Sequence, residues 1–400
     1  MGRDTSVNSS PARRLTVVIP ALNEEAAIAN TIQRCLDARP AILLAGGLET
    51  LEIIVVSDGS TDRTAEIARG FQGVDVCEFS SNRGYGAALK HGFSRGTGDL
   101  VGFLDADGTC SPEFFSNLTQ AVVVGGADIA LGSRVSSESE MPWIRTLGNR
   151  LFALLLSGLS NRRVRDTASG MRVMRRDVLS DIGPLPDGLQ YTPAMSARAV
   201  LKGLRVVELP MPYSARIGES KLSASRDGWR FLQAILDGVL LYRPERLFLV
   251  MAVSLLSAAV VLSLHPIEFY ATHARVEEWM IYRFLVASLL SGAGVGSLIA
   301  GALVGRMSEL VIARDHDTFW RSVLIGVFRG PSAVGIVLIL SCASLALVWP
   351  GIREYASTGH VTLHWTRVVV SAFGLMTAFQ TMLAAMLLRI VSLWLESVST

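Results

Sequence analysis

The chain has 400 residues, of which 50% are hydrophobic and 18% charged, and its formal net charge is +2 at pH 7. This apolar content excludes an intrinsically disordered chain, and the near-neutral charge gives no support for nucleic-acid binding. The length suggests two or three structural units. The cysteines lie far apart without metal-ligand spacing, so we predict that they are reduced and buried. They are Cys35, Cys77, Cys110 and Cys342.

The first half of the chain has the pattern of a folded α/β domain. Residues 1–14 are polar and predict a flexible N-terminal tail, whereas residues 15–222 contain short apolar runs separated by stretches typical of helices. Because the runs lack strict alternation, they predict buried strands of a mainly parallel sheet covered on both faces. The predicted strands are 15–20, 51–56, 74–79 and 99–104, and the predicted helices are 24–38, 63–69 and a third ending near residue 94.

Acidic side chains follow three of these predicted strands. Glu24 follows the first strand, Asp58 the second, and Asp105 and Asp107 the fourth. Ligands of parallel sheets bind beyond the carboxyl ends of the strands, so these carboxylates should lie on one rim. Mg²⁺ and Mn²⁺ prefer such hard oxygen ligands and often bind through one or two carboxylates plus phosphate groups. The sequence therefore predicts a divalent metal site that holds a phosphorylated ligand.

Four ordered segments resemble the family-2 glycosyltransferases, whose catalytic domain is the Rossmann-like GT-A fold. They are residues 18–24 (VIPALNE), 55–62 (VVSDGSTD), 84–89 (GYGAAL) and 103–107 (FLDAD). Two later segments, 165–172 (RDTASGMR) and 216–222 (RIGESKL), look like the polyprenyl-phosphate branch, which includes dolichol-phosphate mannosyltransferase. The resemblance covers about residues 15–225. It implies a nucleotide sugar such as GDP-mannose or UDP-glucose as donor, and a polyprenyl or dolichyl phosphate as acceptor.

The resemblance also implies roles for particular residues. The metal would be held by Asp105 and Asp107, with the backbone of Ala106 close to the donor, and Thr109 stands where dolichol-phosphate mannosyltransferases have a glutamine ligand. Leu22 stands where many relatives have a tyrosine, so aromatic stacking on the base is not available there. The positions implied to bind the donor are Pro20, Leu22, Glu24, Asp58, Asp105, Ala106, Asp107, Arg134, Arg216 and Lys221.

A second set of residues is implied at the acceptor and leaving group. Arg134, Arg165 and Ser169 would bind the lipid phosphate and the leaving group, and Asp107 of the metal pair also belongs to the implied catalytic residues. Asp166 is expected to orient Arg165 or Arg172 rather than to take a proton. A polyprenyl monophosphate is substantially dianionic near neutral pH, because the second pKa of a phosphate monoester is about 6. Its oxygen therefore needs positioning more than deprotonation, and one direct displacement would invert the anomeric centre.

The second half of the chain predicts an all-α transmembrane domain over residues 247–400. Four uncharged runs are each long enough to cross a hydrocarbon core of about 30 Å. They are 247–264, 284–304, 332–349 and 368–388. Residues 223–246 precede them and predict an amphipathic helix lying in the membrane interface, since apolar residues recur there at helical spacing.

Arginines predict how this integral membrane protein is oriented. They concentrate before the first span and between the second and third spans, which places the catalytic domain and both termini in the cytoplasm. The arginines are Arg226, Arg230, Arg243, Arg246, Arg306, Arg314, Arg321 and Arg329. Residues 151–156 form a short apolar run that suits either the domain core or a bilayer-facing surface.

Two alternative functions use the same features. A processive polysaccharide synthase shares the first half, but its Gln-x-x-Arg-Trp motif does not occur in this sequence. A non-catalytic membrane scaffold would not require the Asp105/Asp107 pair or the phosphate-binding cations. The sequence favours an inverting glycosyltransferase that moves one sugar to a polyprenyl phosphate.

Overall fold

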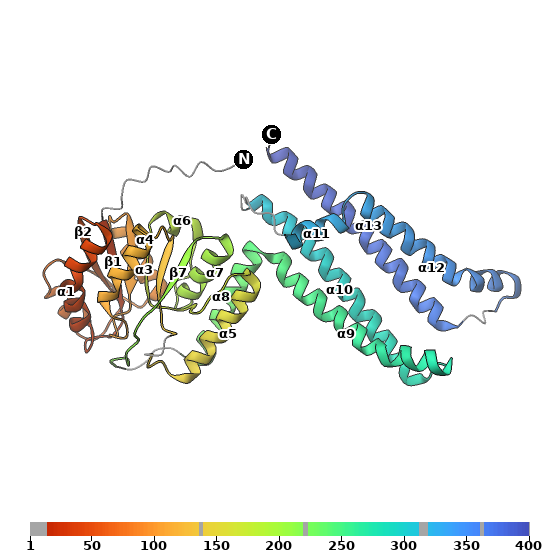
Figure 1. Ribbon diagram of the computed structural model, residues 1–400, viewed down its shortest axis with the longest axis horizontal. Helices are drawn as coiled ribbons and strands as arrows, with labels where there is room; N and C mark the ends of the chain where they lie inside the picture. The colour runs from red at the N-terminus through yellow and green to blue at the C-terminus, as the bar shows by residue number, and fades with distance from the viewer. Residues whose placement is uncertain (1–13, 136–138, 219–222, 312–318, 361–363, 400) are drawn as a thin grey trace. The chain divides into compact units, whose positions relative to one another are not determined.

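The computed structural model describes residues 14–135, 139–218, 223–311, 319–360 and 364–399. The chain divides into two compact units, Met1–Gly238 and Val239–Thr400, which we describe separately. The first unit contains a seven-stranded sheet with helices on both faces (Figure 1). Its strands are β1 Arg14–Ala21, β2 Thr50–Asp58, β3 Val74–Phe79, β4 Leu100–Leu104, β5 Ile129–Ser133, β6 Met171–Arg175 and β7 Val206–Pro210.

The sheet is mainly parallel, as the sequence predicts. Its strand order is β3-β2-β1-β4-β6-β5-β7, and β6 is the strand that runs antiparallel to its neighbours β4 and β5. In the parallel part, Val18 pairs with Ile54 on one side and Phe103 on the other. This register brings the carboxyl ends of β1, β2 and β4 to one edge of the sheet. The acidic residues predicted for the site, Glu24, Asp58, Asp105 and Asp107, lie at or just after these strand ends.

Helices cover both faces of the sheet because successive strand residues point to opposite sides. On β1, Val17 and Ile19 join the cluster under α1 and α4, whereas Val18 joins the cluster under α3, α6 and α7. Burial on both faces explains the continuous apolar runs in the sequence. The helices of this unit are α1 Ile28–Gly46, α2 Thr64–Arg69, α3 Tyr85–Arg95, α4 Phe115–Val123, α5 Trp143–Ser160, α6 Asp177–Ile182 and α7 Tyr191–Lys202, followed by α8 Ala224–Tyr242, which ends beyond the unit boundary.

The first helix differs from its predicted bounds of 24–38. It begins at Ile28 because the backbone turns before it: Asn23 has a positive φ of 48°, and Glu24 N–H donates to Thr64 Oγ1 at 2.8 Å. The helix then continues past Pro40 to Gly46, since Ile42 is buried in the core cluster. Gly47 ends it in the left-handed conformation.

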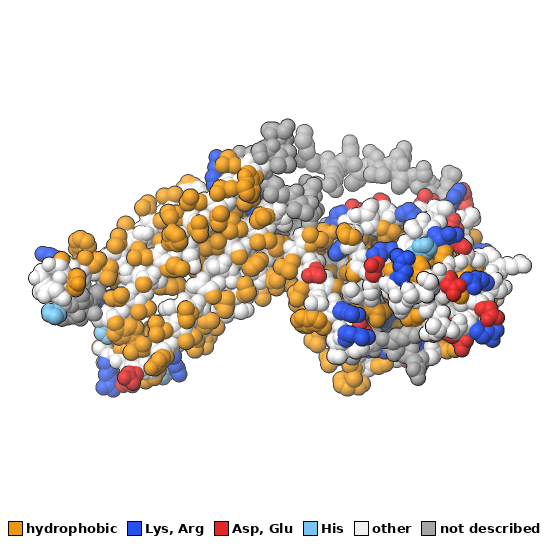
Figure 2. Space-filling model, turned by 180° about the vertical axis from the view of Figure 1, so that it is seen from behind, with side chains coloured by type: hydrophobic (Ala, Val, Ile, Leu, Met, Phe, Trp, Pro, Cys, Tyr) orange, Lys and Arg blue, Asp and Glu red, His pale blue; other side chains and the backbone are white. Residues whose placement is uncertain are grey.

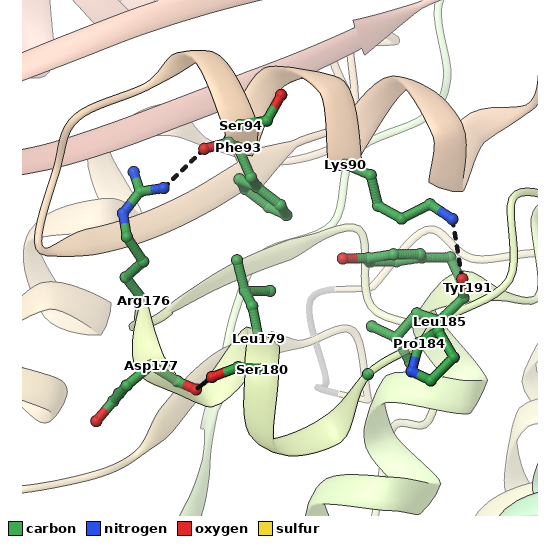
Figure 3. Close-up of a pocket in the computed structure, with 11 residues that line it drawn as sticks. Lys90, Phe93, Ser94, Arg176, Asp177, Leu179, Ser180, Pro184, Leu185 and Tyr191 are labelled. Carbon is green, nitrogen blue, oxygen red and sulfur yellow. Dashed lines mark hydrogen bonds between the residues drawn. The ribbon is translucent and has the colours of Figure 1, made fainter.

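The second unit consists of long apolar helices. They are α9 Pro244–His273, α10 Glu278–Val311, α11 Phe319–Val327, α12 Pro331–Thr358 and α13 Trp365–Ser399. Four of them (α9, α10, α12 and α13) are long and apolar enough to cross a membrane and contain the four predicted spans. Hydrophobic side chains cover much of their outer surface (Figure 2). Small residues allow close packing: a Cβ on Gly294 would lie 2.8 Å from Leu256 Cγ.

The cysteines follow the prediction in part. Cys35, Cys77 and Cys110 are buried thiols in the first unit. Cys342 is exposed, contrary to the prediction, because it lies on the outer surface of α12, where exposed side chains are largely apolar. Burial raises the pKa of the Cys35 thiol to about 12, so this thiol is unreactive at neutral pH.

Candidate active site

Two carboxylates from different strand ends contact one guanidinium. Arg216 Nη1 lies 3.0 Å from Asp107 Oδ2, and Arg216 Nη2 donates to Glu24 Oε1. Asp107 and Glu24 are 7% and 9% exposed, so each carboxylate is buried beside a counter-charge. The Nε atom of Arg216 is buried and has no hydrogen-bond partner among the described residues. The predicted donor-binding residues Glu24, Asp107 and Arg216 are therefore brought together.

Asp107 is held by its neighbours in the turn after β4. Thr109 donates to Asp107 Oδ1 from both its backbone nitrogen (3.1 Å) and its hydroxyl (2.7 Å). The segment that carries Arg216 is bonded to the same turn, because Ile217 N–H donates to the Asp107 carbonyl and Ser214 N–H to the Thr109 carbonyl. These contacts hold Arg216 over Asp107.

Asp105 lies beside Asp107 in a more enclosed position. The Tyr85 hydroxyl donates to Asp105 Oδ1 at 2.7 Å. Burial and the negative charge of Asp107 raise the pKa of Asp105 to about 7. The fit is tight on the other side, since a Cβ on Gly170 would lie 1.8 Å from Asp105 Oδ2. An additional cation near Asp105 would therefore stabilise its charged form.

Arg134 and Asp166 form a buried, two-pronged ion pair. Arg134 Nε and Nη2 donate to the two Asp166 oxygens at 2.8 and 2.7 Å, and the backbone nitrogen of Arg134 adds a third bond at 2.9 Å. Burial alone would raise the pKa of Asp166, but the guanidinium holds it below its usual range. The Arg134 guanidinium also lies 5.8 Å from the Tyr213 ring centroid. This packing fixes the direction of Arg134.

The partner of Asp166 corrects the sequence-based expectation of Arg165 or Arg172. Arg172 is fully buried and donates to the backbone carbonyls of Thr167, Ser169 and Thr192, at 3.1 to 3.3 Å. Arg165 is exposed, and its backbone nitrogen donates to Glu208 at 3.0 Å. Within the described part of the chain, neither Arg165 nor Arg172 forms a hydrogen bond or ion pair with the Asp166 carboxylate that was expected to orient it.

The other predicted residues lie in varied surroundings. Both oxygens of Asp58 accept backbone N–H groups, from Arg83 at 2.7 Å and Gly84 at 2.9 Å. Ser169 is fully buried, and its hydroxyl donates to the Gly132 carbonyl. Ala106 is buried, and its carbonyl accepts the Thr31 hydroxyl at 3.1 Å.

Two further donor-site predictions lie on or next to β1. Pro20 is buried on β1 and Leu22 is partly buried just after it. Lys221 lies outside the described residues. The roles predicted for these residues stay predictions.

Two residues of the site were missed by the sequence reasoning. Tyr85 lies in the GYGAAL segment, whose resemblance to the family assigns no role to the tyrosine, and its hydroxyl donates to Asp105. Tyr213 lies beneath Arg134 and forms bridges with Cys110 and Ser139. A tyrosine between two glycines, such as Tyr85, is a usable signal for a site residue, since a buried tyrosine hydroxyl needs a polar partner. Tyr213 has no comparable pattern.

Comparison with known proteins identifies the class. The family model described as glycosyl transferase family 2 matches residues 16–183. The low-salt glycan biosynthesis hexosyltransferase Agl6 of Haloferax volcanii is 33% identical over 358 residues, covering 86% of this chain and 82% of that protein. The chain therefore belongs to glycosyl transferase family 2 and is a glycosyltransferase, which confirms the predicted family.

Two further relatives match about half of the chain. The dolichyl-phosphate hexose transferase of Haloferax volcanii is 34% identical and covers 54% of this chain and 89% of that protein. The polyprenol monophosphomannose synthase of Mycolicibacterium smegmatis is 32% identical and covers 54% of this chain and 83% of that protein. Among solved structures, a Mycobacterium tuberculosis glucosyl-3-phosphoglycerate synthase with Mn²⁺ and UDP has a TM-score of 0.45 and 22% identity, covering 56% of this chain and 80% of that chain.

Proposed function

We propose that this membrane-anchored enzyme transfers one sugar, mannose or glucose, from a nucleotide-diphosphate sugar to a polyprenyl or dolichyl phosphate. The observation that carries the proposal is the pairing of two carboxylates, Glu24 and Asp107, with the guanidinium of Arg216 at the sheet edge, next to the buried carboxyl of Asp105, because a diphosphate and its cation need both kinds of group. The four apolar helices and the named activities of the 34% and 32% identical relatives support a lipid-linked acceptor.

The residues present fit a divalent cation bound with a diphosphate. Asp105 and Asp107 offer hard oxygen ligands, and because burial and the negative charge of Asp107 raise the pKa of Asp105, a nearby cation would stabilise its carboxylate form. The described residues contain no cluster of three His, Cys, Asp or Glu side chains suited to a metal, so phosphate oxygens and water would complete the shell. We propose Mg²⁺ or Mn²⁺ on these two aspartates. When bound, the ion neutralises charge on the leaving diphosphate. The role of Thr109 as a third ligand stays a prediction.

The reaction needs no general base on the enzyme. An oxygen of the dianionic acceptor phosphate forms a bond to the anomeric carbon while the bond from that carbon to the diphosphate oxygen breaks. The electron pair leaves with the nucleoside diphosphate, and the configuration inverts. The enzyme's task is therefore to hold two anionic groups close together. We propose that Arg216 and Lys221 bind the donor diphosphate, Arg216 through its Nε, which has no hydrogen-bond partner among the described residues.

We propose that Arg134 faces the acceptor phosphate in an orientation fixed by Asp166. Arg165, whose side chain is exposed, would add a second guanidinium there. Ser169 would support the acceptor site indirectly, because its buried hydroxyl donates to the Gly132 carbonyl and so holds the backbone near Arg134. Pro20, Leu22 and the Asp58 loop would line the nucleotide.

Tyr85→Phe is expected to weaken the binding of Mn²⁺ together with the nucleoside diphosphate about tenfold. The change removes the hydroxyl that donates to Asp105 at 2.7 Å and leaves the ring in place. Loss of a hydrogen bond to a metal ligand typically costs 10- to 100-fold in affinity or activity. Titration calorimetry measures the effect, with Tyr282→Phe, an exposed tyrosine of α10, as control. Unchanged affinity would exclude Tyr85 as the group that positions Asp105.

Labelled GDP-mannose and UDP-glucose, supplied in parallel with a C55 polyprenyl phosphate and Mg²⁺ or Mn²⁺, test the function. We expect label from one donor to enter a mild-acid-labile lipid. A growing polar polymer would instead identify a processive synthase. Donor binding without transfer to any polyprenyl phosphate would contradict the proposal.

The arginine distribution further leads us to propose a cytoplasmic catalytic domain and cytoplasmic termini, which protease protection of sealed vesicles can test.

A further inference from the structure

We propose that α5 is a bilayer-docking helix, which rests on lipid headgroups and the upper acyl chains through one exposed apolar face. The face consists of apolar side chains that are 50–74% exposed, and its members are Trp143, Ile144, Leu147, Leu151 and Leu154. At 3.6 residues per turn these five positions fall on one side of the helix. We call them the α5 stripe.

The opposite side of α5 is the side that packs on the domain. Asn149, Ala153 and Leu156 are 6%, 4% and 0% exposed. The run 151–156, which suited either core or bilayer by sequence, is therefore divided between the two sides of one helix. The helix therefore has apolar residues on both sides, but folding of the domain buries only one of them and leaves the α5 stripe uncovered. A contiguous exposed apolar patch of this kind marks an interaction surface.

The charge around the α5 stripe favours a lipid surface. Residues 141–165 contain five arginines and no aspartate, glutamate or lysine. Arg150 is exposed and lies at the edge of the stripe, while Arg162 and Arg163 are exposed just beyond the end of the helix. A helix with an apolar side, tryptophan and flanking arginines is typical of segments that lie in the interface of anionic membranes.

A short stretch of chain links a neighbour of this helix to a segment that is long and apolar enough to span a membrane. Phe152 of α5 packs against Phe231 of α8, with ring centroids 6.2 Å apart. Trp229 on α8 is 60% exposed. One residue, Arg243, separates the end of α8 from α9, which is long and apolar enough to span a membrane. Figure 1 shows α5 at an outer edge of the first unit, and Figure 2 shows exposed hydrophobic side chains along an edge of that unit. The bilayer is therefore a more accessible partner for the stripe than a soluble protein.

The buried side of α5 is bonded to the loop that carries the proposed acceptor residues. Asn149 Nδ2 donates to the Arg165 carbonyl at 3.2 Å, and Asn149 Oδ1 accepts the Thr167 N–H at 3.1 Å. Ser157 Oγ accepts the Val164 N–H at 2.9 Å. Docking of α5 would thus hold Arg165 and Asp166 at headgroup depth, where a polyprenyl phosphate presents its phosphate. This consequence rests on the proposed function, whereas the docking itself does not.

Spin labels on the full-length protein in vesicles of phosphatidylcholine and phosphatidylglycerol test the docking. Cys342→Ser provides the background, because the other three cysteines are buried. Leu151→Cys carries the test label, and Leu44→Cys on α1, where Leu44 is 86% exposed, carries the control. We expect the label at 151 to relax with oxygen but not with a water-soluble nickel chelate, and the label at 44 to show the reverse. Chelate access at 151 would overturn the proposal, and so would protection from both reagents, which would indicate a second protein chain.

A matched pair of variants tests the consequence for catalysis. Leu147→Asp combined with Leu151→Asp should raise the KM for bilayer-embedded polyprenyl phosphate at least tenfold and leave donor affinity unchanged, because the site itself is intact. Leu44→Asp should change neither value. An unaltered KM in the double variant would contradict the proposed link to the acceptor. Failure of the wild-type protein to transfer any sugar would count against the proposed function, while the spin-label result would still decide the docking.

Discussion

Asp107→Asn is expected to lower the rate of sugar transfer about 10³-fold. The substitution keeps the size of the side chain and an oxygen that can accept the bonds from Thr109. It removes the negative charge that faces Arg216 and that we propose binds the cation of the donor. Losing one preorganised electrostatic contact to a developing charge commonly costs 10²- to 10³-fold, and here two such contacts are lost together. Transfer of label from the preferred donor measures the change.

The Asp107 result needs two accompanying measurements. Binding of Mn²⁺ with the nucleoside diphosphate, followed by electron paramagnetic resonance, should weaken in parallel with transfer. Glu113→Gln serves as the control, because Glu113 is an exposed acid paired with Arg34 away from the site. Transfer by Asp107→Asn within tenfold of wild type would exclude Asp107 as a metal ligand.

The sheet was predictable where apolar runs coincide with parallel strands. Val18, Ile54 and Phe103 sit on three strands whose runs are continuous, because helices bury both faces. β6 was not predictable in this way. It is short, contains Arg172, and runs antiparallel between β4 and β5, so its place in the sheet depends on tertiary contacts. The four membrane-spanning candidates were the easiest elements to find, since length and absence of charge suffice.

The candidate site was predictable in its carboxylates and less so in its pairings. Asp105 and Asp107 follow a strand end, and elementary sheet geometry places them with Glu24 on one edge. The partner of Asp166 is 32 residues away along the chain, at Arg134, and no local spacing indicates it. Asp58 illustrates the opposite case, because its position at a strand end serves a loop: its two oxygens accept the backbone N–H groups of residues 83 and 84.

These differences have a common physical cause. Strand-end position depends on the local pattern, whereas the identity of an ion-pair partner depends on which loops the fold brings together. The Arg134 and Asp166 pair is the strongest example, since both side chains are largely buried at 14% and 0% exposure. Arg134 and Asp166 must therefore be tested together.

Asp166→Asn is expected to destabilise the first unit by about 3 kcal/mol, because breaking a buried ion pair leaves one charge without compensation. For a unit of this size that corresponds to a fall in Tm of about 6–12 °C. Asn would also lose one of the two forked contacts that direct Arg134, so transfer should fall about 10²-fold even in protein that remains folded. Thermal unfolding followed by circular dichroism, and transfer measured well below the Tm, separate the two effects.

The difference in stability between wild type and Asp166→Asn should depend on pH with a definite sign. Because the pKa of Asp166 is lower in the folded chain than in the unfolded chain, its contribution to stability is complete above about pH 4, the usual aspartate value. The contribution is lost as pH falls through the lower folded value. The Tm gap between wild type and Asp166→Asn should therefore be constant from neutral pH down to about pH 5 and narrow below pH 4. A gap that widens on acidification would show that Asp166 is not charged in the folded protein.

A double replacement distinguishes a positioning role from a structural one. Arg134→Met with Asp166→Leu removes both charges, and well-packed apolar replacements of a buried pair are often neutral or stabilising. We expect the double variant to regain most of the lost Tm and to stay inactive in transfer, because the guanidinium proposed to face the acceptor phosphate is gone. Recovery of both stability and transfer would mean that the pair serves the fold alone. Recovery of stability without transfer would assign Arg134 to the reaction and Asp166 to its orientation.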